Sequence, residues 1–342
     1  MSIVAVVIGP TAVGKTDILI SALEGMRAEI ISADSRQIYR YMDIGTAKPG
    51  PEQLRKVAHH LVDCVDPDRP LDAARYAQMA CRAIDDVFLR SGFPVVSGGS
   101  GLYIKALLEG FFDGPGADAD MRRHLIEQEK AGGRGTLHHR LGRVDPDSAR
   151  RIHPHDLFRT VRALEVFERT GIPLTRWHRD GRNRKLDRAF SLVGLYRTRK
   201  ELYRRIDQRV DEMVTRGFIE EVKGLVERGY SEDLAALSTV GYREMLAMLD
   251  GRISLEDAVS LMKRNTRQYA KRQMTWFGRI EQMLWIDAGE TAPAGQKNRL
   301  RRVLEDLSND RCPSGEAVVR SRERMRQAWS WRKDQADGRS DR

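Results

Sequence analysis

The sequence predicts an α/β fold in which a parallel sheet is flanked by helices and carries an inserted helical domain. Three observations lead to this prediction. Short apolar runs rich in β-branched residues alternate with segments of helical periodicity as far as residue 110. A glycine-rich turn directly follows the first of these runs. From about residue 117 to residue 181 the periodicity is helical, and no segment has the pattern of a strand. Alternating strands and helices are typical of an open parallel sheet.

The expected strands of the first half are short apolar runs that end at a glycine or a polar residue. The composition of the first run indicates burial on both faces, as in parallel sheets. The runs are Ile3–Ile8, Glu29–Ser32, His60–Val65 and Phe93–Ser97. Between them we expect helices over residues 14–26, from an N-cap at Asp72 to about residue 90, and over residues 102–108.

The second half begins at a cluster of helix-breaking residues, Gly114-Pro115-Gly116. We expect residues 113–187 to form the helical insertion. A strand returns at Phe190–Tyr196, helices follow to about residue 281, and Leu284–Ile286 adds a last strand. Residues 1–112 and 188–288 then form the core. Residues 289–342 are polar and basic, and we expect a tail that is either frayed or helical over residues 320–333.

Bulk composition narrows the class of protein. The 342 residues are 41% hydrophobic, which is typical of a globular chain. The formal net charge of +10 suggests a polyanionic partner, although on charge alone a basic protein without one is an equal alternative. The 3 cysteines are widely spaced and indicate neither a disulfide framework nor a zinc site. There is no targeting signal and no run near the ~20 apolar residues of a membrane span, so we expect a cytoplasmic protein without a membrane partner.

A phosphate-binding loop follows the first expected strand. It fits the pattern G-x-x-x-x-G-K-[ST] and consists of Gly9, Pro10, Thr11, Ala12, Val13, Gly14, Lys15 and Thr16. In such a loop the backbone N–H groups face a polyphosphate, the lysine adds a mobile charge, and the threonine hydroxyl can bind Mg²⁺. Because a strand precedes it and a helix follows it, a chance match is the minor alternative. The motif predicts a polyphosphate ligand and does not distinguish ATP from the diphosphate of an isoprenoid.

Two further turns follow expected strands and should face the same crevice, because ligands of open α/β sheets bind at the carboxyl ends of the strands. Asp34 follows the second strand, and its position is compatible with a Mg²⁺ ligand, a general base or a helix N-cap. The segment Ser35–Gln37 offers polar contacts beside it. In the turn Gly98–Gly101, the Ser100 hydroxyl could contact a phosphate or an amine, or the turn could serve geometry alone.

Two helical segments carry clustered cations. From Lys263 to Arg279 the chain has six basic residues and no acidic residue, and aromatic residues are interleaved. This pattern is typical of an RNA-binding surface, although a solvated face with the aromatic residues in the core is an equal alternative. In the other segment, Arg205 and Arg209 are four residues apart. They could neutralise a diphosphate or could pair with neighbouring aspartates.

These stretches resemble the bacterial tRNA dimethylallyltransferases, also called tRNA isopentenyltransferases. The resemblance covers about residues 3–287, and its blocks occur in the family order. They are Gly9–Thr16, Asp34–Tyr39, Met42–Pro49, His59–Asp63, Gly98–Tyr103, Arg162–Val166, Val240–Glu244 and Thr266–Phe277. The blocks Asp43–Pro49 and Thr266–Phe277 are far more specific than the phosphate-binding loop.

The resemblance implies a P-loop NTPase-like core that does not hydrolyse ATP. The family reaction moves the dimethylallyl group of dimethylallyl diphosphate to the N6 amine of adenosine 37, in tRNAs that read codons beginning with U. Carried over to this chain, Asp34 resembles the general base, while Lys15, Arg209 and Thr16 with Mg²⁺ would stabilise the departing diphosphate. Ser100 stands where the family usually has Thr, and we expect its hydroxyl to keep a catalytic role. We expect a monomer.

The resemblance also implies which residues contact the tRNA anticodon stem-loop, whose target adenine must leave the base stack. Near the crevice these are Asp34, Ser35, Arg36, Gln37 and Ser100. In the insertion they are Arg122, Phe158, Arg159, Thr160, Val161 and Arg162. Later in the chain they are Ser238, Thr239, Val240, Gly241, Tyr242 and Arg243, and the basic segment adds Arg267, Lys271 and Arg272.

Three rival functions remain open from the sequence. A small-molecule kinase would use the same loop, but the insertion and the basic segment argue against it. A prenyltransferase that acts on free AMP or ADP is disfavoured by the tRNA-type blocks. An RNA-binding protein without catalysis would not need both Lys15 and Asp34.

Overall fold

The computed structural model describes residues 3–110, 114–181, 188–289 and 293–329, and the chain divides into two compact units. The larger unit combines Met1–Ile104 with Asp187–Arg342, and the smaller unit is Lys105–Leu186. The smaller unit thus begins at Lys105, whereas the expected insertion began at residue 113. Within the described residues, no helix is long and apolar enough to cross a bilayer.

The larger unit is built on a six-stranded sheet in which every neighbouring pair is parallel. The strands stand in the order β3-β2-β4-β1-β5-β6. Their bounds are β1 Ile3–Ile8, β2 Ala28–Ala33, β3 His59–His60, β4 Phe93–Gly98, β5 Ala189–Tyr196 and β6 Met283–Asp287. All residues of β1 are buried, because β1 has a strand on each side and lies under helices. The predicted α/β class is confirmed.

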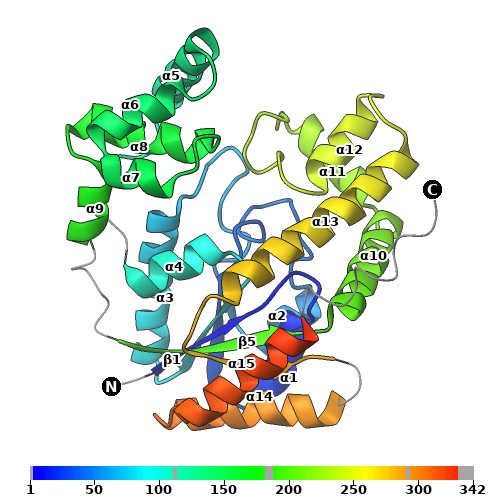
Figure 1. The fold of residues 1–342 in the computed structure, drawn as a ribbon. Helices are drawn as coiled ribbons and strands as arrows, with labels where there is room; N and C mark the ends of the chain where they lie inside the picture. Colours follow the sequence, from blue (N-terminus) through cyan, green and yellow to red (C-terminus); the bar gives the residue numbers. More distant parts are fainter. Residues whose placement is uncertain (1–2, 111–113, 182–187, 290–292, 330–342) are drawn as a thin grey trace. The chain divides into compact units, whose positions relative to one another are not determined.

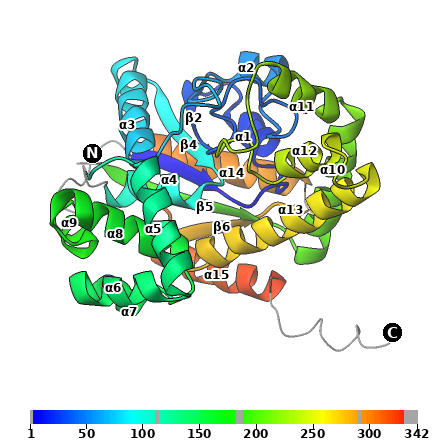
Figure 2. The same cartoon turned by 90° about the horizontal axis from the view of Figure 1, so that it is seen from above.

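The helices of the larger unit connect and cover these strands. They are α1 Lys15–Leu23, α2 Pro51–Lys56, α3 Ala73–Leu89, α10 Arg199–Thr215, α11 Phe218–Glu227, α12 Tyr242–Leu249, α13 Leu255–Phe277, α14 Pro293–Ser308 and α15 Gly315–Ala328, and α4 Gly101–Glu109 starts in this unit. Asp72 caps α3 as expected, since its side chain accepts a hydrogen bond from the Arg75 N–H. Helices α10 and α13 lie side by side (Figures 1 and 2).

Close packing at the carboxyl end of the sheet brings two turns together. Strand β4 lies between β2 and β1, so its terminal turn lies beside the ends of both neighbours. Gly98 leaves no room for a Cβ, because such an atom would overlap the Ala33 carbonyl. The Ser100 N–H donates to that carbonyl at 3.1 Å. The sequence Gly98-Gly99-Ser100 therefore fixes Ser100 next to the residue that follows Ala33, which is Asp34.

The third expected strand, His60–Val65, is wrong over most of its length. Only His59–His60 pairs with β2. Leu61 and Asp63 have φ of 60° and 57°, in the left-handed region, so the chain leaves the extended conformation there. The following N–H groups instead bond to the segment after β2, as in the 2.9 Å bond from Cys64 to the Ile38 carbonyl.

The expectation of a frayed tail is wrong for residues 293–329. Helix α14 packs on α1 and β1, and it buries Leu300, Leu304 and Leu307. Helix α15 packs along β6, where the Ser321 hydroxyl accepts a 3.0 Å hydrogen bond from the Trp285 N–H. Since β6 is the last strand, α15 occupies the edge at which a further strand would pair. The helix expected at 320–333 starts earlier, at Gly315, and residues 330–342 lie outside the described part of the chain.

Within its described residues the smaller unit has helices joined by loops and no strand, as the periodicity predicted. After the end of α4 its helices are α5 Ala119–Gly132, α6 Thr136–Val144, α7 Pro146–Arg151, α8 Leu157–Thr170 and α9 Leu174–Gly181. Leucines and valines of α5, α6 and α8 form a core of its own. The carboxylate of Glu165 lies fully buried beside this core.

Candidate active site

The phosphate-binding loop joins β1 to α1 at the centre of the sheet. Its lysine folds back over the loop, and Lys15 Nζ donates to the carbonyls of Gly9 at 2.9 Å and Pro10 at 3.3 Å. Gly14 has a φ of 92°, which a residue with a Cβ adopts only with strain. At the start of α1, the amides of Gly14, Lys15 and Thr16 are available to a polyphosphate.

Three arginines surround the loop from the side of β5 and α10. Arg197 Nε donates to the Val13 carbonyl at 2.8 Å, and Arg205 Nε donates to the Ala12 carbonyl at 2.9 Å. Arg209 Nη1 lies 3.5 Å from the Thr11 hydroxyl. Because the carbonyls of the loop are already satisfied by cations, the surface offered to a ligand is strongly positive.

Burial acts on two of these cations. It lowers the pKa of Lys15 to about 8, against the attraction of the Asp34 carboxylate and with a smaller lowering by Arg209. Burial also lowers the pKa of the Arg209 guanidinium, again against the charge of Asp34. Burial makes the charged forms of Lys15 and Arg209 less stable than they are in water. A bound anion would therefore stabilise these charged forms strongly. The loop is therefore prepared for a diphosphate or a larger polyphosphate.

Asp34 lies in the turn that follows β2. Its Oδ1 accepts the N–H groups of Arg36 at 2.9 Å and Gln37 at 3.3 Å, so it caps its own turn. Among the described residues, no hydrogen bond reaches the second carboxylate oxygen, Oδ2. One oxygen thus fixes the geometry, and the other can accept a proton. The cap and base roles predicted for Asp34 are therefore compatible.

Ser100 orients the same turn. Its Oγ accepts a 2.8 Å hydrogen bond from the Ser35 N–H and donates to Ser35 Oγ at 3.0 Å. The side chain is 9% exposed. In this structure its O–H donates to Ser35, so Ser100 holds the Asp34 turn, and the contact with substrate expected for its hydroxyl stays a prediction.

Helix α13 closes the site with residues that the basic pattern did not reveal. Buried Gln273 bonds to Thr11 N–H and to the Gly99 carbonyl, both at 2.9 Å. Tyr269 lies one turn earlier, and burial, followed by the charge of Asp34, raises its pKa to about 12. The Trp276 ring would overlap any Cβ at Gly101. Their i, i+4 and i, i+7 spacing and their place in the block Thr266–Phe277 were the sequence signals for this face.

Magnesium fits this site as a companion of a diphosphate. The described residues contain no group of three or more His, Cys, Asp or Glu side chains that could hold a metal ion. Mg²⁺ that arrives on phosphate oxygens keeps several waters and needs only one or two protein ligands. The Thr16 hydroxyl at the end of the loop and the Asp34 carboxylate after β2 are oxygen donors that would suit it.

Several residues expected to contact tRNA have structural roles in the larger unit. Tyr242 is 1% exposed, packs edge-on against Phe218 at 5.0 Å, and donates to Glu221 at 2.6 Å. Gly241 is also buried. Direct contact of the Tyr242 side chain with RNA is therefore ruled out in this conformation, because its surface is already covered.

The other members of the same segments are at least partly accessible. Arg36 donates to the Ala235 carbonyl, and Gln37 donates to the carbonyls of Thr46 and Ala47, so both hold neighbouring loops. Accessible positions beyond these are Ser35, Ser238, Thr239, Val240 and Arg243, of which Ser238 and Arg243 are exposed.

In the smaller unit, the expected contacts on α8 divide by burial. Thr160 and Val161 are 1% and 4% exposed, so their side chains belong to the core and have no surface for RNA. Arg122 and Arg162 bind the buried Glu165. Phe158 and Arg159, at the start of α8, are the exposed members: the Phe158 side chain is 77% exposed.

The basic face of α13 is partly used inside the protein. Lys263 pairs with Asp211 at 2.6 Å and Arg267 pairs with Asp207 at 2.5 Å, which joins α13 to α10. The expected RNA contact of Arg267 is thus in competition with an intramolecular ion pair. Lys271 and Arg272 are exposed, and the Arg272 guanidinium lies 5.9 Å from the centre of the Tyr269 ring.

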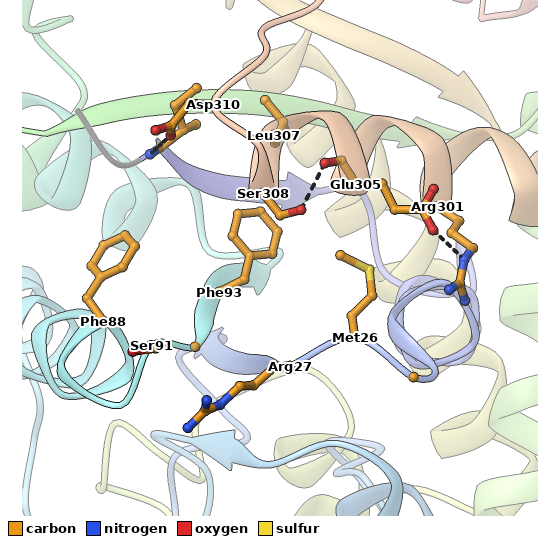
Figure 3. A pocket seen from close by; sticks show the side chains of 13 residues that line it. Met26, Arg27, Phe88, Ser91, Phe93, Arg301, Glu305, Leu307, Ser308 and Asp310 are labelled. Carbon is orange, nitrogen blue, oxygen red and sulfur yellow. Dashed lines mark hydrogen bonds and ion pairs between the residues drawn. The ribbon is translucent and has the colours of Figure 1, made fainter.

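A cavity lies at the amino-terminal end of the strands, opposite to the end that carries the phosphate-binding loop. This cavity of about 620 Å³ is lined by the starts of β1 and β4 and by α14, and Phe88, Phe93 and Met26 face it (Figure 3). Asp310 accepts the Ile3 N–H at its rim. Because this cavity lies at the end of the strands opposite to the phosphate-binding loop, it has no part in the site described above.

Comparisons with known proteins identify the family of this chain. The family model described as IPP transferase matches residues 37–280. The tRNA dimethylallyltransferase of Thermotoga maritima is 46% identical over 301 residues, which are 88% of this chain and 97% of that protein. The tRNA dimethylallyltransferase of Syntrophobacter fumaroxidans is 44% identical over 308 residues, covering 90% of each chain.

Solved structures give the same result. The full-length tRNA isopentenylpyrophosphate transferase of Bacillus halodurans is 37% identical, with a TM-score of 0.66, and the match covers 90% of this chain and 97% of that one. A eukaryotic dimethylallyltransferase described as acting on tRNA is 26% identical, with a TM-score of 0.76, over 91% of this chain and 80% of that one.

Proposed function

This chain belongs to the IPP transferase family, and from that premise we propose that it is a tRNA dimethylallyltransferase. It transfers the dimethylallyl group of dimethylallyl diphosphate to the N6 amine of adenosine 37 in tRNAs that read codons beginning with U. One observation of the structure carries the proposal. The Asp34 carboxylate stands at the end of β2 within electrostatic range of Lys15 and Arg209, the cations of the phosphate cradle.

That juxtaposition suits a transfer in which a diphosphate leaves as an amine attacks. The adenine N6 forms a bond to the first carbon of the dimethylallyl group, and the bond from that carbon to the diphosphate oxygen breaks. The surplus proton on N6 passes to Asp34 Oδ2, since Oδ1 is held by backbone N–H groups. Lys15 and Arg209 stabilise the negative charge that develops on the diphosphate.

Mg²⁺ would add further positive charge on the diphosphate, with Thr16 as its protein ligand. We propose a monomer as the active form. We also propose that the reaction takes place in the cytoplasm, which is consistent with a tRNA acceptor.

The acceptor is supported by accessible cationic and aromatic side chains. Lys271 and Arg272 are exposed on α13, and Phe158 and Arg159 are exposed on α8 of the smaller unit. Arginine and lysine bind RNA phosphates, and an exposed phenylalanine can stack on an unpaired base. The names of the relatives and the tRNA complex among the solved structures favour this acceptor over the small molecules of a kinase.

Incubation of the purified protein with Mg²⁺, radiolabelled dimethylallyl diphosphate and unmodified tRNA tests the proposal. A parallel reaction contains AMP in place of tRNA, and ATP is omitted from both. Label in tRNA alone is the expected result. Label in AMP alone would keep the chemistry and reject the acceptor, and label in neither would return the question to a kinase and an assay of ATP consumption.

A further inference from the structure

One buried side chain links the phosphate cradle to the turn beside it. Gln273, on α13, is 7% exposed. Its carbonyl oxygen accepts the Thr11 N–H of the cradle at 2.9 Å, and its amide nitrogen donates to the Gly99 carbonyl at 2.9 Å. The cationic pattern of α13 does not account for this residue, because it faces inward and is neutral.

We propose that Gln273 is a positioning residue that fixes the diphosphate cradle relative to the Asp34 turn, an inference that rests on the function proposed above. The link is a continuous chain of hydrogen bonds. Gln273 joins Thr11 to Gly99, the next residue Ser100 bonds to Ser35, and Asp34 caps the same turn. Both the site that holds the leaving group and the site that takes the proton are thereby fixed to one rigid helix.

The chemistry of the link requires an amide of this length. Thr11 offers a donor and Gly99 offers an acceptor, so the bridging group must accept at one atom and donate at the other. A carboxylate accepts at both atoms and would face the Gly99 carbonyl without a proton. A methionine side chain has a similar volume, but its thioether cannot donate a hydrogen bond and accepts one only weakly. Asparagine has the right groups but is one methylene shorter, so it cannot reach both partners.

The surroundings of Gln273 leave it little freedom. A Cβ at Gly99 would lie 2.5 Å from Gln273 Nε2, so the amide fills the space that the absence of a side chain provides. Tyr269 lies one turn before Gln273 on α13, where the charge of Asp34 helps to raise its pKa to about 12. The same helix face therefore borders both the cradle and the carboxylate.

Three variants of the full-length protein test the role. Gln273→Met removes both hydrogen bonds, and Gln273→Glu removes the donor. Gln208→Met is the matched control, since Gln208 is exposed on α10. The measurements are binding of inorganic diphosphate with Mg²⁺ by calorimetry, kcat and KM for dimethylallyl transfer, and tRNA affinity. Circular dichroism and thermal unfolding verify the fold, and Gln273→Asn replaces Gln273→Met where the latter does not fold.

Gln273→Met is expected to weaken diphosphate binding at least tenfold and to lower kcat/KM about a hundredfold, because small misplacements of reacting groups have large effects on rate. Both kcat and the KM for dimethylallyl diphosphate should change, while tRNA affinity stays within about twofold of wild type. Gln208→Met should behave as wild type.

Gln273→Glu supplies a readout that a merely structural role would not change. A protonated carboxylic acid has one donor and one acceptor, so it can imitate the amide. Burial favours the neutral acid. The affinity of Gln273→Glu for diphosphate should therefore approach that of wild type as the pH falls from 8 to about 5.5.

Wild-type diphosphate binding and kinetics in Gln273→Met would overturn the proposal. A loss confined to tRNA affinity would also overturn it, because it would assign Gln273 to the RNA surface. A third outcome separates the two proposals. If wild type binds diphosphate more tightly than Gln273→Met but transfers no label to tRNA, the function proposed above fails while the positioning of the cradle stands.

Discussion

Replacement of Lys15 by methionine should make the protein more stable near neutral pH while it disables the cradle. Burial lowers the pKa of Lys15 from the ordinary value of 10.5 to about 8, against the attraction of Asp34. At about 1.36 kcal/mol per pKa unit, a difference of this size corresponds to roughly 3 kcal/mol, and partial access of water to the side chain reduces the expected effect to about 2 kcal/mol.

The sign follows from proton binding in the two states. Between pH 8 and pH 10.5 the unfolded chain holds the Lys15 proton and the folded chain has released it, so wild-type stability gains from rising pH. Below pH 8 the cost of the buried charge is present in full. Lys15→Met has no such titration, so its advantage over wild type should be greatest at pH 7 and should shrink by about 2 kcal/mol towards pH 10.

Urea denaturation of both proteins at pH 7, 8, 9 and 10, followed by tryptophan fluorescence, measures this difference. Lys56→Met, at an exposed position of α2, controls for the loss of a surface lysine. The same Lys15 variant should bind inorganic diphosphate at least a hundredfold more weakly than wild type, because it lacks the cation nearest the loop. A stability difference that stays constant from pH 7 to pH 10 would refute the buried, destabilised lysine.

Four further outcomes follow from the geometry. Asp34→Asn keeps the oxygen that caps its turn and should lower kcat by about 10²–10⁴-fold with unchanged tRNA affinity in a filter-binding assay; normal turnover would reject the base assignment. Phe158→Ala should weaken tRNA binding by about 1–3 kcal/mol without affecting diphosphate binding. Glu165→Gln should destabilise the protein by about 2–3 kcal/mol in chemical denaturation, because it leaves the partly exposed Arg122 and Arg162 without their counter-charge. Ser321→Ala, which leaves the Trp285 N–H without its acceptor, should lower stability by about 1–2 kcal/mol.

The pH dependence that Glu165 gives the smaller unit has the same sign as that of Lys15, because both groups have a lowered pKa and stability therefore rises with pH, but it lies in the acid range. Burial alone would raise the pKa of Glu165, but hydrogen bonds from Arg122, the Asp118 N–H and Arg162 together lower it below the ordinary value of 4.5. A depressed carboxylate pKa stabilises the fold above the ordinary value, and this stability is lost as the pH falls through the lowered pKa. Wild type is more stable than Glu165→Gln near neutral pH. This difference in the free energy of unfolding should therefore shrink as the pH falls below about 4.

The sequence predicted those parts of the fold and site that depend on local patterns. The run Ile3–Ile8, its glycine-rich turn and the helix after it are continuous in the chain, so their secondary structure could be predicted directly, while their polyphosphate ligand stays a prediction. Asp34 was found because the end of a parallel strand is a known location for ligands. The helical periodicity of residues 117–181 predicted the character of the smaller unit.

Features that depend on tertiary contacts were missed. Nothing local distinguishes Gln273, which meets Thr11 from 262 positions away in sequence, or Arg197, which meets Val13 from 184 positions away. The basic stripe of α13 was interpreted as a surface for RNA, yet Arg267 has an aspartate on α10 as its partner. Ion pairs between helices cannot be separated from exposed cations by spacing alone.

Composition also misled the prediction for the C-terminal segment. It is polar on average, but Leu300, Leu304 and Leu307 recur at helical spacing and are buried. The false strand at His60–Val65 has the reverse explanation: its apolar residues are suited to a strand, but the left-handed conformations of Leu61 and Asp63 end it after two residues.

Helix α15 has a practical consequence for handling the protein. Removal of the chain from Ser314 onward would uncover the outer edge of β6, a row of backbone groups that readily pair with a strand of another molecule. Such a shortened protein would keep every residue of the cradle and yet tend to aggregate during expression. An affinity tag is therefore better joined after the last residue than substituted for the final helix, and poor solubility of a truncated form would say nothing about its chemistry.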